Sequence, residues 1–361
     1  MVNRLLALLP STAALLLSSA TLAQTPPEVS VSIKPLHSLV SAVMEGVQSP
    51  HLIVDGGGSP HTYSLRPSDA EALAEADAVF WIGPDLETFL IGPIEGLAPD
   101  ARRVALQDID GLERLPLREG GTFEAHVHDD HGHGDDHDHD HGHDHDHGHD
   151  HDHGHDHDHG HDHDHGHDHD HGHDHDHGHG HGHGHGHGAF DAHYWLDPEN
   201  AQRFVRHIAT VLSEIDPHHA ESYQQNAAET EARLTSLTED MRATLAPVAD
   251  EPFIVFHDAY RYLEDRFGLN TVGSITVSPE QSPSARRIAE IRDKIAELGA
   301  TCIFAEPQFE SRLVAILVEE TPARAGVLDP LGADIPNGSD LYFDLMRFNA
   351  EALRGCLQQS S

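Results

Sequence analysis

The chain has 361 residues, of which 62 are aspartate or glutamate, 21 are lysine or arginine and 38 are histidine, and its formal charge at pH 7 is −41. A surface of this sign repels nucleic acid and anionic lipid and attracts cations, so we expect no nucleic-acid partner. The length has room for one large or two medium domains.

The first residues are typical of an export signal. Arg4 is followed by an apolar run over 5–17 that Pro10 interrupts, and 21–23 supplies the small residues expected before a cleavage site. The run is too short for a membrane anchor, and no cysteine follows it to carry a lipid. We therefore predict a signal peptide over 1–23, a periplasmic location and no insertion into the membrane.

Strand and helix patterns then alternate, which predicts a lobe built on a parallel sheet. Apolar or β-branched runs predict strands at 29–33, 52–54, 78–82 and 103–106. Apolar residues at helical spacing predict helices at 38–47, at 68–76 with Ser68 as N-cap, and from Leu86. A glycine turn at 55–60 follows the second strand, and His61 stands directly after this turn.

A segment from His126 to Gly188, in which histidine alternates with aspartate and glycine, interrupts this lobe and holds thirty of the 38 histidines. Imidazole suits zinc, copper and nickel, and the aspartates attract any divalent cation. With frequent glycine and almost no apolar residue, the segment is expected to be disordered and to bind metal weakly. The alternative is that the repeat expanded by copying error, so that its length has no function.

The helical and strand patterns resume at 191–198, where Asp197 can cap and Pro198 can begin a helix to about Glu214. A longer helical pattern at 217–245 would span about 40 Å and is the expected connector between lobes. Later strands are predicted at 253–256, 271–277, 302–304 and 326–328. Later helices are predicted at 258–267, 284–298, 311–319 and 340–357.

We therefore predict an α/β protein of two lobes, each with a parallel-rich sheet flanked by helices. The expected domains are 24–215 with the insertion 126–188, a rigid linking helix at 216–246, and 247–361. Cys302 and Cys356 are the two cysteines; in an exported protein an even count favours a disulfide, and two buried thiols are the alternative.

Three histidines outside the repeat share one expected position, at the end of a strand or at the start of a helix. His61 follows the glycine turn, His193 precedes the capped helix and His257 ends a strand, as does Asp329. Ligands gather at the carboxyl ends of parallel strands, so both lobes can supply them to one cleft. Three imidazoles and a fourth ligand form an ordinary tetrahedral zinc site.

The remaining histidines outside the repeat are expected to be caps, rim residues or solvated side chains: His37, His51, His207, His218 and His219. A catalytic zinc would need a base such as Asp258 or Glu306. The sequence contains no HExxH, GxSxG or CxxC motif, so we predict that the chain is not an enzyme.

Several segments resemble the periplasmic zinc-binding component of ABC transporters, the ZnuA family. They are GGGSPHTYSLRPSDAEALAEADAVFWIGPDLE, AHYWLDPENA, FHDAYRYLEDRFGL, TCIFAEPQFE and GVLDPLGADI. The resemblance implies two α/β lobes joined by one long rigid helix, with zinc held between them and passed to a membrane permease. A histidine-rich insertion is also a mark of the zinc members. We further expect the protein to be a monomer.

The resemblance places the family's three histidine ligands on His61, His193 and His257, and its disulfide on Cys302 and Cys356. Well-known zinc members have a glutamate before the first histidine, where this chain has Pro60. The resemblance therefore leaves water or Asp329 as the fourth ligand.

The third imidazole favours zinc over manganese. We predict capture of Zn²⁺ for import through an ABC permease, with one tight cleft site and weak sites in the repeat. The alternatives are a periplasmic metal buffer or chaperone and a binder of manganese, nickel or copper.

Overall fold

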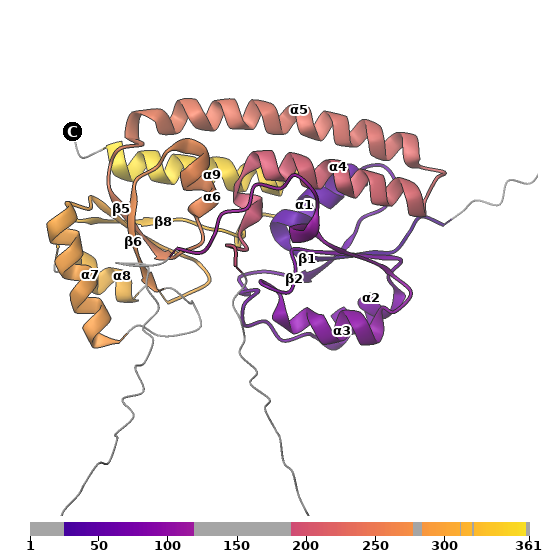
Figure 1. The fold of residues 1–361 in the computed structure, drawn as a ribbon, viewed down its shortest axis with the longest axis horizontal. Coiled ribbons are helices and arrows are strands. Elements are labelled where there is room, and N and C mark those ends of the chain that lie inside the picture. The colour runs from indigo at the N-terminus through magenta and orange to yellow at the C-terminus, as the bar shows by residue number, and fades with distance from the viewer. Residues whose placement is uncertain (1–24, 119–188, 277–283, 311, 320, 359–361) are drawn as a thin grey trace, which may run out of the picture. The chain divides into compact units, whose positions relative to one another are not determined.

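The computed structural model describes residues 25–118, 189–276, 284–310, 312–319 and 321–358. The predicted signal peptide and the whole histidine-rich repeat lie outside the described residues, so their predictions remain untested. The described residues form two parallel sheets with helices around them (Figure 1).

The first sheet has four parallel strands in the order β2-β1-β3-β4. Its strands are β1 Val29–Ile33, β2 His51–Val54, β3 Ala78–Trp81 and β4 Arg102–Ala105. Its helices are α1 Lys34–Val43, α2 Pro67–Glu75 and α3 Ile91–Leu97. Every residue of β1 and β3 is buried, as expected for central strands covered on both faces.

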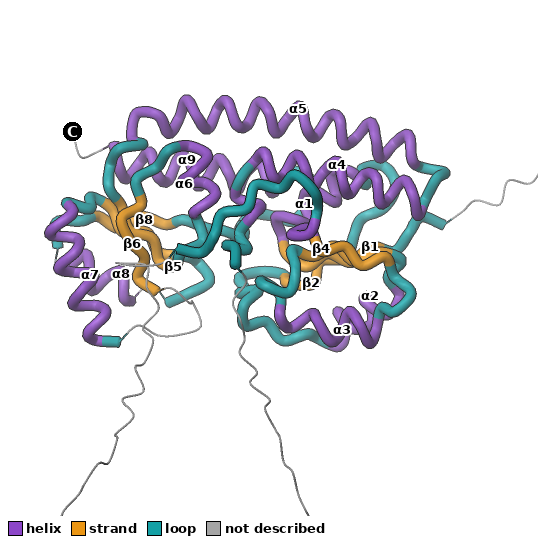
Figure 2. Tube along the Cα trace, viewed as in Figure 1, coloured by secondary structure: helices purple, strands orange, loops and turns teal. Residues whose placement is uncertain are grey.

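The second sheet repeats this plan in the order β6-β5-β7-β8, again with parallel pairs only. Its strands are β5 Phe253–His257, β6 Thr271–Thr276, β7 Cys302–Ala305 and β8 Arg324–Val327. Its helices are α6 Arg261–Phe267, α7 Ala285–Leu298 and α8 Arg312–Glu319. The predicted fold class, two parallel α/β sheets with helices, is therefore confirmed (Figure 2).

Three longer helices lie alongside the two sheets, and the middle one in sequence packs against both of the others: α4 Pro198–Ile215, α5 Ala220–Leu245 and α9 Leu341–Leu357. The buried residues of α5, from Tyr223 to Leu245, recur at helical spacing and form one face. This face packs against α1 and α4 beside the first sheet and against α6 and α9 beside the second (Figure 1). One helix of 26 residues thus shares its contacts between both halves of the chain.

The core is continuous between the two halves. Along β5, Phe253 and Val255 belong to the same hydrophobic cluster as β1 and β3 of the first sheet. Ile254 and Phe256, on the opposite face, belong to a second cluster with α7 and α8. This alternation follows from the two-residue period of a strand. It fixes β5, and with it His257 at its end, relative to the first sheet.

Some predicted boundaries were wrong. The first helix begins at Lys34 and not at Ser38, because Pro35 is compatible with a first helical turn, where its missing N–H is not needed. The second begins at Pro67, and Asp69 accepts the backbone N–H of Arg66 in place of a cap by Ser68. The helix predicted from Leu86 is a 3₁₀ turn at Thr88–Leu90 followed by α3.

Cys302 at the start of β7 and Cys356 in α9 form a disulfide, which confirms that prediction. The bond ties the second sheet to the last described helix. None of the helices within the described ranges is both long and apolar enough to cross a membrane.

Candidate metal centre

Three histidines from distant parts of the chain meet at one point. His61 lies in the turn after β2, His193 immediately precedes the 3₁₀ turn Tyr194–Leu196, and His257 is the last residue of β5. One ring nitrogen of each lies within 4.8 Å of the corresponding nitrogens of the other two. Within the described ranges, no other group of histidine, cysteine, aspartate or glutamate side chains is arranged to hold a metal ion in this way.

The spacing of two of these nitrogens suits a metal ion. Nε2 of His193 and Nε2 of His257 are 3.4 Å apart. Two nitrogens bound at about 2.0–2.1 Å to one tetrahedral zinc ion lie about 3.3 Å from each other. Both side chains are buried, so the pair is held at this separation by its surroundings.

Each buried histidine is oriented by a carboxylate, and the sequence named one of the two, Glu306, only as a possible base for a catalytic zinc. An oxygen of Asp191 lies 2.7 Å from Nδ1 of His193, and an oxygen of Glu306 lies 2.8 Å from Nδ1 of His257. Burial disfavours the charged form of His257, but the charge and hydrogen bond of Glu306 outweigh it and raise the pKa of His257. These carboxylates hold the Nδ1 side of each ring and leave Nε2 for a metal.

The third histidine is in a different environment. His61 is only half-buried and lies in a turn that contains Gly56, whose φ of +70° favours glycine. Its ring centre lies 5.7 Å from that of His193 and 6.0 Å from that of His257. The cavity between the three rings, which Pro330 and Phe309 help to line, measures about 10 Å³ and so has room for one water-sized body.

Asp329, the predicted candidate for a fourth ligand, is not in the three-histidine group. Its side chain accepts hydrogen bonds from the backbone N–H groups of Leu331, Gly332 and Ala333 at 2.6–2.9 Å. It also accepts one from the amide of Gln308 at 2.8 Å. These bonds shape the loop that brings Pro330 and Leu331 to the cavity.

Two histidines predicted to be solvated have buried partners. His51 lies 3.4 Å from Asp69, and His219 lies 2.6 Å from Asp216. The sequence could not show the first pair, because its partners lie 18 residues apart, whereas the three-residue spacing of Asp216 and His219 could have suggested the second. His37, predicted as a cap or a rim residue, is instead buried within α1, with Nε2 3.0 Å from the carbonyl oxygen of Pro50.

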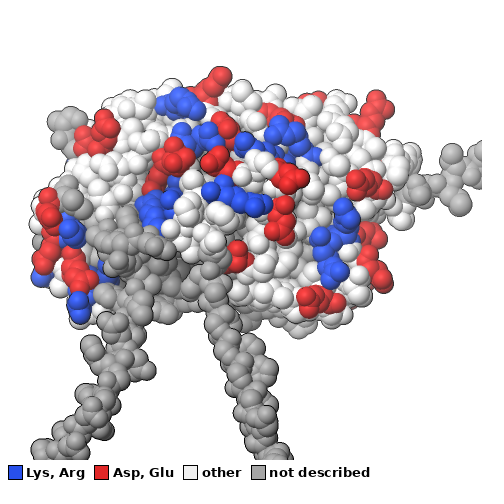
Figure 3. All heavy atoms as spheres, in the orientation of Figure 1, with Lys and Arg blue, Asp and Glu red and all other residues white. Residues whose placement is uncertain are grey.

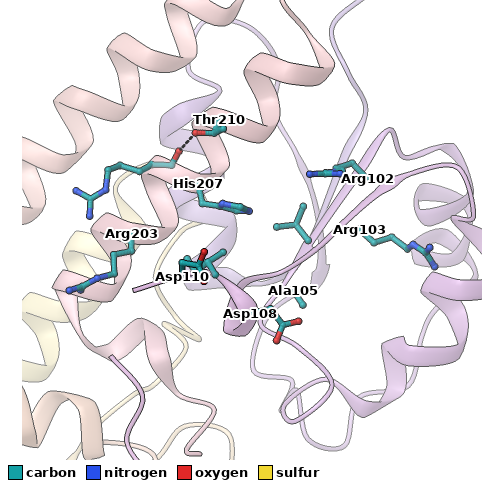
Figure 4. A pocket seen from close by; sticks show the side chains of 11 residues that line it. Arg102, Arg103, Ala105, Asp108, Asp110, Arg203, His207 and Thr210 are labelled. Atoms are coloured by element: carbon teal, nitrogen blue, oxygen red, sulfur yellow. Dashed lines mark hydrogen bonds between the residues drawn. The ribbon is translucent and has the colours of Figure 1, made fainter. Parts of the chain in front are cut away.

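A larger cavity, of about 690 Å³, lies between β4 and α4 and has a different chemistry. Arginines at 102, 103, 203 and 206 line it together with His207 and two aspartates. Arg103 and Arg203 point in opposite directions, away from its middle (Figure 4). The lining residues therefore do not converge on one ligand. On the face of the molecule drawn in Figure 3, basic and acidic side chains are likewise interspersed.

Comparison with known proteins agrees with this geometry. Residues 29–356 match the protein family described as ZnuA, zinc-uptake complex component A, periplasmic. The chain belongs to this family. The high-affinity zinc uptake system protein ZnuA of Brucella suis biovar 1 is 55% identical over 331 residues, which cover 92% of each chain. That of Paracoccus denitrificans is 39% identical over 332 residues, also 92% of each chain.

The fold is also shared with solved structures. A crystal structure of ZnuA has a TM-score of 0.66 at 21% identity and covers 92% of this chain and 99% of that one. A zinc-bound deletion mutant of ZnuA has the same TM-score and identity, with 98% of that chain covered. The ZnuA family consists of zinc-binding transport proteins, so membership confirms the predicted family and the prediction that the chain is not an enzyme.

Proposed function

We propose that this protein is the periplasmic component of a high-affinity zinc-uptake system, which binds Zn²⁺ through His61, His193 and His257 and delivers it to the membrane permease of an ABC transporter. The observation that carries the proposal is the group of three imidazole nitrogens within 4.8 Å of one another. The names of the ZnuA relatives support zinc as the cargo.

The donor set favours zinc among the divalent metals. Three neutral imidazoles suit zinc, whereas a site for manganese would use harder oxygen ligands. Both cysteines are consumed by the disulfide, so neither thiolate is free to bind a soft metal. The hydrogen bonds that Asp329 already accepts favour water as the fourth ligand.

The remaining parts of the chain complete the proposal. Residues 1–23 serve as the export signal, 24–215 and 247–361 are the two lobes, and 216–246 link them. The repeat at 126–188 collects zinc weakly and raises its concentration near the cleft, since an ion released by one imidazole is recaptured by the next.

Competition with a zinc chelator tests the tight site. The mature protein is expected to hold one Zn²⁺ against the chelator, and His61→Ala, His193→Ala and His257→Ala should each weaken binding by orders of magnitude. His218→Ala is the matched control, because this histidine lies at the start of α5, away from the group. Normal zinc binding by His257→Ala would refute the assignment of the site.

Growth of a strain that lacks the gene separates import from storage. Loss of an import component should cause zinc starvation under chelation, and supplied zinc should relieve it. Loss of a periplasmic buffer or chaperone should instead cause sensitivity to excess zinc, and that result would contradict the proposed function.

A further inference from the structure

The described residues that flank the histidine-rich repeat are joined to each other. The N–H of Asp191 donates to the carbonyl of Leu115 at 2.9 Å, and that of Leu117 donates to the carbonyl of Ala189 at 3.3 Å. Pro116 and Phe190 form an antiparallel bridge between the same stretches. We call 115–118 together with 189–191 the insertion base.

The insertion base belongs in sequence to the first half of the chain but is held by the second. The hydroxyl of Tyr262, in α6, donates to the carbonyl of Asp191 at 2.8 Å and accepts the N–H of Leu115 at 3.1 Å. Tyr262 is 1% exposed, so these bonds are shielded from water. One side chain of α6 therefore fixes both stretches of the insertion base.

Arg118, at the end of the first stretch, makes the second link. Its guanidinium forms an ion pair and a hydrogen bond with Glu264 of α6 and lies 3.7 Å from an oxygen of Asp258. The side chains of all three are 16% exposed or less, so water screens these contacts only weakly. Asp258 directly follows the ligand His257, and Glu264 lies in the next helix.

Both contacts lead to the metal centre. Asp191 in the insertion base holds Nδ1 of His193, while Asp258 begins the connection between β5 and α6 and Glu264 lies in the first turn of α6. A fixed positive charge this close would, by Coulomb repulsion alone, oppose binding of Zn²⁺. A benefit from Arg118 must therefore come from the geometry it maintains.

We propose that Arg118 is a positioning residue for the metal centre, which joins the insertion base to the β5–α6 turn and so keeps His193 and His257 at the separation that suits one ion. The proposal rests on the zinc site proposed above. It assigns to the insertion base a role in the tight site that is separate from any binding by the repeat.

Two substitutions distinguish an effect of the position of Arg118 from an effect of its charge. Arg118→Met removes the charge and keeps most of the aliphatic part of the side chain. Arg118→Lys keeps the charge but loses the planar guanidinium, which can donate two parallel hydrogen bonds. Arg206→Met is the matched control, since the Arg206 guanidinium pairs with Glu231 at 2.7 Å and its side chain is 54% exposed. Zinc affinity is measured by chelator competition on the full mature chain, together with the visible spectrum of bound Co²⁺ and thermal stability.

Arg118→Met is expected to weaken zinc binding about tenfold or more and to change the Co²⁺ spectrum, which reports ligand geometry. Arg118→Lys should lie between this variant and the wild type, and Arg206→Met should match the wild type. If Arg118→Met does not fold, Arg118→Lys alone carries the test, with weaker zinc binding than the wild type expected.

Tighter zinc binding by Arg118→Met than by the wild type would overturn the inference, because the loss of a repulsive charge would then explain the result. Zinc affinity equal to that of the wild type in both Arg118 variants would overturn it as well, because Arg118 would then have no effect on the site. A fall in thermal stability with unchanged affinity and spectrum would also overturn it, because Arg118 would then stabilise only the fold. If the wild type itself held no zinc against the chelator, the proposed function would fail, and this inference with it.

Discussion

Two buried carboxylates decide which nitrogen of each buried histidine can face a metal. Asp191 and Glu306 accept hydrogen bonds from the Nδ1–H groups of His193 and His257, so Nε2 of each ring keeps its lone pair. Glu306 is almost completely buried and follows β7 at the edge of the sheet where His257 ends β5. The two carboxylates therefore fix the rings before any ion arrives.

Removing either negative charge should weaken the tight site. Asp191→Asn and Glu306→Gln are each expected to lower zinc affinity about 10- to 100-fold, because the ligand becomes less basic and its ring less well held. Chelator competition at about pH 8, above the ordinary pKa of imidazole, measures this effect with little interference from protons.

Glu231→Gln serves as the control for these variants, since Glu231 pairs with Arg206 away from the metal centre. Affinities of Asp191→Asn and Glu306→Gln that equal that of the control would mean that the histidine rings are oriented by packing alone.

The junction of α4 and α5 depends on one buried acid. Asp216 accepts a hydrogen bond from the hydroxyl of Tyr223 at 2.9 Å and from Nδ1 of His219 at 2.6 Å. Burial by itself would raise the pKa of Asp216, but the bonds from His219 and Tyr223 outweigh it and lower this pKa. The ionised carboxylate thus fixes the direction in which α5 leaves α4.

Asp216→Asn should lower the free energy of unfolding by about 1–3 kcal/mol near neutral pH, because hydrogen bonds to a charged group are lost. The pKa in the folded state lies below that of the unfolded chain, so the stabilisation is present above the unfolded pKa of about 4. This stabilisation disappears as the pH falls through the pKa that Asp216 has in the folded state. Urea unfolding at about pH 7 and about pH 3 should therefore show a difference between wild type and variant that narrows at the lower pH.

The control for this comparison is Asp240→Asn, since Asp240 is an exposed aspartate of α5. A difference between Asp216→Asn and the wild type that stays constant at both pH values would contradict the role of the ionised carboxylate.

Considered as a whole, the molecule builds the candidate metal centre from residues outside the repeat. All three histidines of the metal centre lie outside 126–188, and each is supplied by a different part of the folded chain. The shared core and the contacts of α5 with helices of both halves hold these parts together.

Deletion of 126–188 is therefore expected to lower the number of zinc ions bound while one tight site remains. Equilibrium dialysis gives the number of ions, and chelator competition gives the affinity of the tightest one. Since the deletion leaves the insertion base intact, the tight affinity should stay within a few-fold of the wild type. Loss of all tight binding would contradict the proposed division between collector and site.

The sequence by itself determined the fold class, the approximate elements and the three histidines of the metal centre. Alternating strand and helix patterns specify parallel sheets, and the ends of parallel strands are where ligands gather, so His257 could be found from local pattern alone. The disulfide between Cys302 and Cys356 could also be predicted from the sequence, because the chain has only these two cysteines.

Tertiary structure alone decided that Glu306 holds His257 and that Arg118 pairs with Glu264. Glu306 is 49 residues from His257 in sequence, and Arg118 is 146 residues from Glu264, so no local spacing could indicate either pair. The pair of His51 with Asp69 was missed for a related reason, whereas Asp216 lies only three residues before His219, a spacing that could have suggested that pair. Hydrophobic periodicity records which face of an element is buried, but the partner of a buried polar group depends on how distant segments pack.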